Sequence, residues 1–375
     1  MASIGAGKVG NIIEQTGQPM DHSLQRLRGL PRRVILAYLP LVVLWAIYYA
    51  GARLVLDSTD APINYDLVNF LPSFLKSLPF FLIGVAFVVY FRLFVFRSAI
   101  MTPRQRIAAW FKDTPWIEFF LLRFVPTLVY IFGLQRVYVA LKPEIPNIVP
   151  FSWDADFLVW DRVLLFGYDA WEVSHWLLPS AYGSSVIDEL YTAWFYVLFA
   201  CIFVAAMAPL QDRIRLTYLV SFALNWGIGG SLLAIIFSSA GPVYYERLFG
   251  DPVFAPLLDR LNAQHLEFEL SSVIVIEKLW QGHLGKEDIP GLGISAFPSM
   301  HLALATANTC FAFKFGRWWG WAMVAFTAAT LFGSVHLGWH YVVDGIAGIA
   351  LGIVFWALSW RFTGWWLKGR TEIAG

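Results

Sequence analysis

Two short motifs near the C-terminus, Pro298-Ser299-Met300-His301 and His340-Tyr341-Val342-Val343-Asp344, each open a long apolar run. Together they supply two imidazoles and one carboxylate, which are the groups needed to transfer a phosphoryl group through a covalent histidine intermediate without a metal ion. The chain between the motifs must bring both histidines to the same place. These residues therefore predict the fold as well as the chemistry.

The composition indicates a polytopic membrane protein. Hydrophobic residues make up 58% of the 375 residues and charged residues only 14%, which excludes an ordinary soluble domain. Cys201 and Cys310 both lie within apolar runs, where we interpret them as small buried side chains and not as a disulfide or a metal pair. Nothing in the sequence indicates a nucleic-acid partner, and we expect neither a metal nor a cofactor.

Eight apolar stretches come near the roughly 20 residues that a bilayer-crossing helix needs. The sequence therefore predicts an all-α membrane protein with about eight transmembrane helices. Residues 1–33 lack the apolar core of a signal peptide, so the first stretch is expected to remain as a membrane helix. The expected helices lie at about residues 34–54, 75–95, 117–141, 186–207, 216–238, 300–313, 318–335 and 341–360.

Basic and acidic residues are sorted between alternate loops. Short cytoplasmic loops collect Lys and Arg, so the basic loops and both termini are predicted to be cytoplasmic. The opposite loops carry most of the acidic residues, and two of them, residues 142–185 and 240–297, are expected to form structured extracytoplasmic caps. Residues 153–171 alternate apolar and acidic side chains, which predicts a helix in the membrane interface. The expected division is an N-terminal segment 1–33, two additional helices 34–115, a six-helix catalytic core 116–361 and a tail 362–375.

Both histidines are predicted to reach the extracytoplasmic face. The chain from His301 to His340 is 39 residues long, which corresponds to roughly 58 Å of helix at ~1.5 Å per residue, or about two crossings of a ~30 Å hydrocarbon core. His340 and Asp344 are four residues apart, so they share one helix face and the carboxylate can orient the ring.

The residue types predict a division of roles. His340, backed by Asp344, would attack phosphorus, and His301 would protonate the leaving oxygen and later activate the acceptor. The free N–H groups of the first turn after Pro298 favour a phosphate beside His301, and Ser299 would add a hydroxyl. A lipid in the bilayer is the expected substrate, and the acceptor is either water or an alcohol headgroup.

In these residues the sequence resembles the type-2 phosphatidic acid phosphatase superfamily, which includes lipid phosphate phosphatases, inositol phosphorylceramide synthases and vanadium haloperoxidases. That family has a six-helix core in which Pro-Ser-x-His opens one helix and His-x-x-x-Asp opens the helix two later. The pattern His-Tyr-x-x-Asp-Gly at residues 340–345 and the segment Gly241-Pro242-Val243-Tyr244-Tyr245-Glu246 resemble the inositol phosphotransferase branch. The resemblance implies a sphingolipid phosphotransferase with a phosphohistidine intermediate. The alternative is a phosphatase acting on phosphatidic acid or a polyprenyl phosphate.

The phosphate ligands of that family are missing here. Its Lys-x6-Arg-Pro motif has no match, and Ser334 stands where the family has an arginine six residues before the nucleophilic histidine. A phosphate dianion in a low-dielectric site needs compensating donors, so other groups are expected to supply them. The candidates are Ser299, Arg136, Tyr245, Arg247 and His336.

Two functions of other classes stay open at this stage. His301, His336 and His340 are candidate haem ligands, although axial ligands usually lie inside the span and need no carboxylate one turn away. A transporter is the second alternative, against which stands the lack of internal repeats or paired broken helices in the sequence. A Soret band would identify the first class, and passage of unmodified substrate across liposomes would identify the second.

Overall fold

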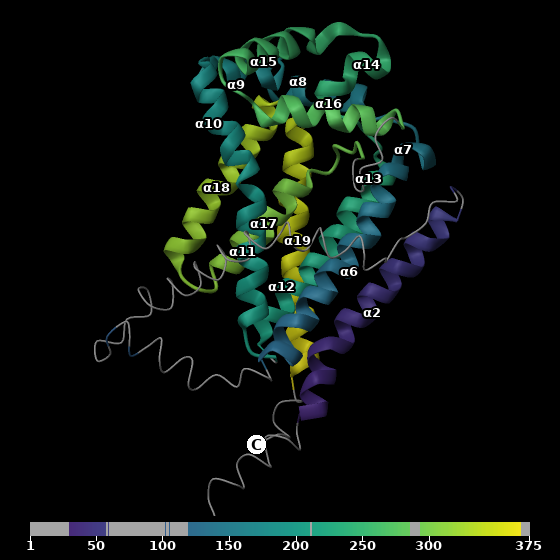
Figure 1. The fold of residues 1–375 in the computed structure, drawn as a ribbon, viewed down its shortest axis with the longest axis vertical. Coiled ribbons are helices and arrows are strands. Elements are labelled where there is room, and N and C mark those ends of the chain that lie inside the picture. The colour runs from purple at the N-terminus through teal and green to yellow at the C-terminus, as the bar shows by residue number, and fades with distance from the viewer. Residues whose placement is uncertain are drawn as a thin grey trace, which may run out of the picture.

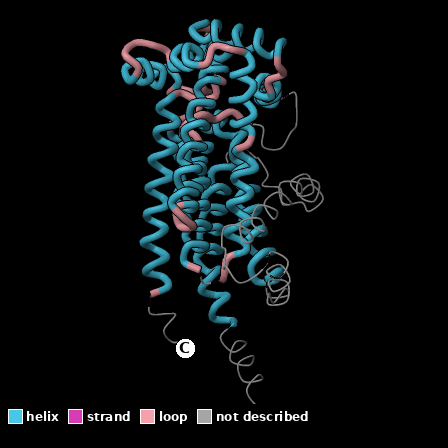
Figure 2. Tube along the Cα trace, turned by 90° about the vertical axis from the view of Figure 1, so that its left-hand side faces the viewer, coloured by secondary structure: helices cyan, strands magenta, loops and turns pink. Residues whose placement is uncertain are grey.

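The computed structural model describes residues 30–57, 59, 102, 105, 119–210, 212–285 and 293–368. Within these residues the secondary structure is helical and contains no strand (Figures 1 and 2), in agreement with the all-α prediction. Long helices form an upright bundle, and short helices lie across one end of it (Figure 1).

The bundle contains the helices that are long and apolar enough to cross a membrane. Among the described residues, five stretches meet this description: Leu30–Leu56, Phe120–Ile148, Ala181–Met207, Arg213–Ile236 and Val342–Leu367. Their elements are α2 (Leu30–Leu56), η1 (Phe120–Phe124), α6 (Val125–Leu141), η2 (Lys142–Glu144), α7 (Ile145–Ile148), α10 (Ala181–Thr192), α11 (Trp194–Met207), α12 (Arg213–Leu224), η3 (Asn225–Leu233), α13 (Ala234–Ile236) and α19 (Val342–Leu367).

Three of the eight predicted spans are not among these five. The span predicted at residues 75–95 lies outside the described residues. The span predicted at residues 300–313 is helix α17 (Met300–Ala312), which has 13 residues and therefore reaches only about 20 Å of a ~30 Å core. Most of α17 is buried among its neighbours, so it is an internal helix of the bundle. The span predicted at residues 318–335 is the 20-residue helix α18 (Arg317–His336).

Glycines in α19 determine how closely this helix packs on α17. A Cβ atom on Gly348 would lie 2.4 Å from the carbonyl oxygen of Ser299, and one on Gly352 would lie 2.5 Å from that of Ala303. Both distances are shorter than real contacts, so this approach requires residues without side chains. It brings the first turns of the two helices together, and the Ser299 N–H donates a 3.1 Å hydrogen bond to the carbonyl oxygen of Asp344.

The short helices form a cap over one end of the bundle (Figure 1). Both long loops that were predicted from the sequence contribute to it. Buried Phe157, Leu257 and Tyr341 belong to one hydrophobic cluster, which joins the cap to the start of α19. The cap elements are α8 (Asp154–Leu164), α9 (Ala170–Leu177), η4 (Pro242–Tyr244), α14 (Tyr245–Phe249), η5 (Pro252–Phe254), α15 (Ala255–Glu267) and α16 (Ser271–His283).

The start of the first described helix and the end of the last one both lie at the end of the bundle that is opposite the cap. Leu30 begins α2 and Lys368 follows α19 at that end of the bundle (Figure 1). Cationic side chains pack on an aromatic ring there, since the Arg213 guanidinium lies 3.8 Å and the Lys314 ammonium 4.0 Å from the ring centroid of Trp360. Cations gathered at one end are typical of a cytoplasmic side. The assignment of this end to the cytoplasm stays a prediction.

Candidate active site

The two motif histidines lie on one cavity. His301 is in the first turn of α17, and His340 is two residues before α19. Their ring centroids are 6.2 Å apart, with the ring planes inclined at 62°. Both side chains line the same cavity of about 380 Å³, beneath cap helix α16. Residues 39 positions apart in the chain are therefore close enough to act on one substrate.

Asp344 fixes the orientation of His340. The Nδ1 atom of His340 lies 3.3 Å from Oδ2 of Asp344, and the same oxygen accepts a 3.0 Å hydrogen bond from the Tyr341 N–H. Asp344 is fully buried, so its carboxylate is shielded from water. A proton on Nδ1, held by the carboxylate, leaves Nε2 as the nitrogen with a free lone pair. This is the arrangement that a nucleophilic histidine needs.

Aromatic side chains at the junction of α10 and α11 hold His301. Its ring stacks on Tyr191, with centroids 4.7 Å apart at an angle of 25°, and lies 4.5 Å from the Trp194 ring. The indole N–H of Trp194 also donates a 2.9 Å hydrogen bond to the carbonyl oxygen of His301. Backbone and ring are thus both anchored, which fixes the direction in which His301 faces His340.

The cavity has an apolar floor and a more polar roof. Its floor includes Tyr138 of α6, Trp226 and Gly230 of η3, and Met300 of α17. Its roof is the face of α16 that carries Ser271, Ser272, Val275 and Leu279. The histidines lie with the segment Gly293–Ala296 and Trp339 in the remaining wall. A molecule with a polar group next to a hydrocarbon portion fits such a lining.

Lys142 is a cavity residue that the sequence interpretation missed. It follows directly after α6 and lines the cavity with His301 and His340. Its charge interacts electrostatically with His301. The spacing of four residues along one helix face is the sequence signal that could have identified it. These residues, which all line the cavity, are Gln135, Tyr138, Val139 and Lys142.

Two aspartates of α8 hold the segment that follows His340 in place, which the sequence interpretation did not predict. The Asp161 carboxylate accepts hydrogen bonds of 2.7 and 3.0 Å from the N–H groups of Val342 and Val343. The Asp154 carboxylate accepts a 3.2 Å hydrogen bond from the Tyr341 hydroxyl and one of 2.8 Å from the Gly241 N–H. The cap thereby holds both the backbone of the short segment that follows His340 and the side chain of Tyr341 within it.

The same residues show which face of this helix is buried. The alternation of apolar and acidic residues predicted an interfacial helix, and in α8 the side chains of Asp154 and Asp161 are buried while those of Trp160 and Val163 are exposed. Burial raises the pKa of each aspartate to about 6, although the backbone hydrogen bonds that each accepts act in the opposite direction.

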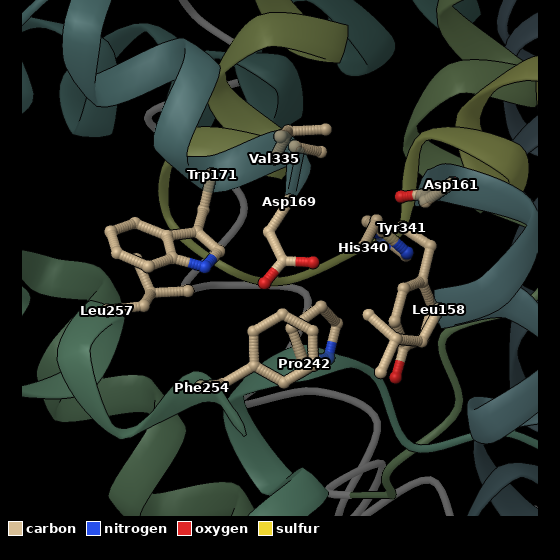
Figure 3. Close-up of a pocket in the computed structure, with 11 residues that line it drawn as sticks. Leu158, Asp161, Asp169, Trp171, Pro242, Phe254, Leu257, Val335, His340 and Tyr341 are labelled. Atoms are coloured by element: carbon tan, nitrogen blue, oxygen red, sulfur yellow. The ribbon is translucent and has the colours of Figure 1, made fainter. Parts of the chain in front are cut away.

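A second, much smaller cavity lies beside His340. It has a volume of about 10 Å³, which is room for about one water molecule. Figure 3 shows Asp169 extending into it between Trp171 and Tyr341. Asp169 is itself bound by the Arg162 guanidinium at 2.6 Å. This space is too small for a substrate, so the larger cavity is the candidate reaction site.

None of the five expected phosphate ligands lines the larger cavity. Ser299 is completely buried between α17 and α19, and its hydroxyl has no hydrogen-bond partner among the described residues. Arg136 lies one position off the helix face formed by Gln135, Tyr138 and Val139, so its side chain leaves α6 in a different direction.

Arg247 and Tyr245 lie elsewhere in the cap. The Arg247 guanidinium forms a 2.9 Å ion pair with Glu277 and lies 5.3 Å from the centroid of the Trp280 ring. The Tyr245 ring is buried against Phe249 and Phe254, with centroid distances of 4.9 and 5.6 Å. The motif that contains both residues therefore contributes to packing of the cap.

His336 lies at a contact between helices, outside the larger cavity. Its Nε2 atom lies 2.8 Å from the Ser184 hydroxyl, and its Nδ1 atom lies 3.3 Å from that of Ser174. Its ring stacks on His175 at a centroid distance of 3.8 Å. These contacts join α18 to α9 and α10. Among the described residues, this cluster included, no group of three or more His, Cys, Asp and Glu side chains is arranged to hold a metal ion.

Comparison with known proteins identifies the family. The family model for the PAP2 superfamily matches residues 155–358, which cover more than half of the chain and include both histidine motifs. The chain therefore belongs to the PAP2 superfamily, as the resemblance of its motifs implied. No curated protein and no solved structure matches it. Membership, together with the five apolar helices, supports a multi-pass membrane enzyme of the phosphatase or phosphotransferase type.

Proposed function

We propose that this protein is a lipid phosphotransferase that works through a phosphohistidine on His340. The observation that supports the proposal is the pair of histidines on one cavity, with ring centroids 6.2 Å apart. Reacting atoms in a productive complex lie about 3–3.5 Å apart. The space between the rings therefore suits one phosphoryl group, with a nucleophile on one side and a proton donor on the other.

The reaction would proceed in two balanced halves. In the first, Nε2 of His340 attacks phosphorus, the bond from phosphorus to the leaving oxygen breaks, and protonated His301 gives its proton to that oxygen. Asp344 stabilises the positive charge that develops on His340. In the second, His301 takes the proton of the acceptor hydroxyl, the acceptor oxygen attacks phosphorus, and His340 is released.

An alcohol headgroup is the acceptor that we favour, as in inositol phosphorylceramide synthases. The pattern His-Tyr-x-x-Asp-Gly supports this branch, and so does the segment that begins at Gly241. That segment packs directly on the loop before His340, since the Val243 N–H donates a 3.2 Å hydrogen bond to the carbonyl oxygen of Gly338. The two sequence features of the branch thus belong to one local structure.

Water is the alternative acceptor, which would make the protein a lipid phosphate phosphatase. The observation that favours it is the solvent-exposed Ser271 at the roof of the cavity, a position from which water reaches the site. The site would face the extracytoplasmic side in either case. The cations near Trp360, at the opposite end of the bundle, support that orientation.

The test is phosphate chemistry by the purified protein on a panel of lipid phosphates and phospholipids in the presence of a metal chelator. Activity is expected in the parent and in His283→Ala, which removes a cap histidine outside the cavity, and is expected to be lost in His340→Ala. Substrate labelled at phosphorus should leave an acid-labile label on the parent protein and none on His340→Ala.

The products then separate the two acceptors. Phosphate retained on a new alcohol means transfer, and free phosphate means hydrolysis. Full activity of His340→Ala would refute the assignment of the nucleophile. A Soret band in the purified protein, or passage of unmodified substrate across liposomes, would favour the haem or transport alternatives.

A further inference from the structure

A stripe of side chains on α6 leads through the cavity towards the histidines. Gln135, Tyr138, Val139 and Lys142 occupy successive positions of one helix face, and each lines the cavity. Lys142 continues the helical backbone of α6, with φ −56° and ψ −45°. Lys142 therefore belongs to the same helical element as Tyr138, and its side chain leaves that element on the face that lines the cavity.

Lys142 brings to the cavity a positive charge that no other described lining residue supplies, the two histidines aside. Apart from His301 and His340, it is the only basic side chain among the described residues that line the cavity. Its side chain forms no ion pair or hydrogen bond with another described residue, unlike that of Arg247, which is paired with Glu277. A phosphate ester in a cavity of low dielectric constant needs a compensating cation, and lysine binds phosphate as a point charge.

Gly293 fixes Lys142 against the segment that leads to His301. A Cβ atom on Gly293 would lie 2.7 Å from the backbone nitrogen of Pro143 and 2.8 Å from the carbonyl carbon and oxygen of Lys142. Only glycine permits this contact between the two backbones. The segment continues through Pro298 to His301, so the position of Lys142 relative to the proton donor is determined by direct packing.

The floor next to this stripe is shaped for a hydrocarbon chain. The rings of Tyr138 and Trp226 lie 4.4 Å apart. A Cβ atom on Gly230 would lie 3.1 Å from the Tyr138 ring and 3.2 Å from the sulfur of Met300, so any side chain there would narrow the cavity. Glycine at this position keeps the apolar part of the cavity open.

We propose that Lys142 binds the phosphate of the substrate and that Gly230 keeps room for the adjoining hydrocarbon. This inference rests on the proposed function and deepens it, because it assigns a phosphate ligand in place of the family's basic ligands, which this chain lacks, and it orients the lipid. The phosphate lies between the histidines and Lys142, and the hydrocarbon follows Tyr138 and Trp226 into the floor.

Kinetics of Lys142→Gln, Lys142→Arg and Arg247→Gln test the ligand. Loss of one charge-assisted hydrogen bond is expected to lower kcat/KM of Lys142→Gln about ten- to a hundredfold and to weaken inhibition by inorganic phosphate by a similar factor. Lys142→Arg should recover part of both, and Arg247→Gln, which removes a paired cation of the same cap, should stay within about twofold of the parent. Equal phosphate inhibition of parent and Lys142→Gln would overturn the proposal.

A binding measurement separates this proposal from the proposed function. Inorganic phosphate should raise the thermal midpoint of the parent, and Lys142→Gln should lose that shift, even when no substrate of the panel is turned over. An unchanged shift in Lys142→Gln overturns the assignment of Lys142 and leaves the histidine mechanism untouched. Lys142→Arg serves as the folding control, because it keeps the charge.

Gly230→Val tests the orientation of the lipid. The variant is expected to lose at least tenfold more in kcat/KM on a long-chain substrate than on a short water-soluble phosphate ester. Equal losses on both substrates would refute the chain path along the floor. A fall on neither would refute it as well.

Discussion

The carboxylate of Asp161, in cap helix α8, accepts a 2.7 Å hydrogen bond from the N–H of Val342, the first residue of α19. The first N–H groups of a helix have no partner within it. Asp161 therefore adds to the capping that α19 has from its own Asp344, which accepts the Tyr341 N–H. His340 is two residues before Val342 and Asp344 is two after it. The cap thus holds the turn that carries His340, the proposed nucleophile, and Asp344, its proposed carboxylate partner.

Replacing Asp161 by Ala should therefore damage both stability and catalysis. The N–H groups of Val342 and Val343 would lose their acceptor, at a cost of about 0.5–2 kcal/mol for a helix cap. We expect a lower thermal midpoint and a fall in kcat of at least tenfold with little change in KM. Asp156→Ala, on the exposed face of the same helix, is the matched control and should behave as the parent. Equal effects of the two substitutions would contradict the role of Asp161.

The pH dependence of stability offers a separate test of the same carboxylate. Burial raises the pKa of Asp161 from 3.8 to about 6, against the hydrogen bonds from Val342 and Val343, which lower it. The protonated form therefore favours the folded state. This contribution is complete below the unfolded pKa of 3.8 and is lost as the pH rises through about 6.

Asp161→Asn removes this titration. The variant should be most destabilised relative to the parent near pH ~4, and the difference should shrink by up to about 3 kcal/mol as the pH rises to ~7. Thermal unfolding in detergent across this range measures it. A difference that is constant with pH would mean that Asp161 does not titrate as its burial requires.

The sequence predicted the meeting of the histidines better than it predicted their surroundings. The 39 residues between His301 and His340 have the length of two membrane crossings, and the chain does return to the same end. The range predicted for α17, residues 300–313, was already close to its 13 residues, but it was counted as a membrane span. The eight-span prediction treated every apolar run as facing lipid, but α17 is apolar because other helices surround it.

Side-chain direction was the weaker part of the interpretation. The spacing of Asp154 and Asp161 identifies one helix face, but periodicity does not say which face is buried. Here the acidic face is buried, because its carboxylates accept hydrogen bonds from backbone N–H groups of neighbouring segments. Arg136 was expected at the site because it is charged and close to the end of its helix. The neighbouring face carries Lys142 instead, and only the packing of α6 against η3 decides between the two.

The contact of Gly348 with Ser299 predicts a position-specific effect of one methyl group. Gly348→Ala would force α17 and α19 apart, since its Cβ would lie 2.4 Å from a carbonyl oxygen, and overpacking of this kind costs about 1–3 kcal/mol. Gly51→Ala, in α2, is the matched control, because nothing lies within 4 Å of its Cβ position. Thermal unfolding should show a clear loss for the first variant and none for the second. An unchanged midpoint for Gly348→Ala would contradict the tight approach.

Trp194 provides the test of the proton donor. Its indole N–H holds the backbone of His301 through a 2.9 Å hydrogen bond, and its ring packs on the imidazole, so Trp194→Phe removes the hydrogen bond and keeps most of the packing. We expect a fall in kcat of about tenfold on a lipid ester, whose alkoxide leaves only when it is protonated. Trp176→Phe, at an exposed position of the cap, should have no effect.

The leaving group distinguishes misplacement of the donor from general damage to the fold. A phosphate ester of an acidic phenol needs little protonation of its leaving oxygen, so Trp194→Phe should lose far less activity on that ester than on the lipid. The nucleophile and the phosphate ligand act equally on both substrates, so a defect in either would lower both rates together. Equal losses on the two substrates would therefore show that Trp194 supports the cavity as a whole, and a loss confined to the lipid ester would assign proton donation to His301.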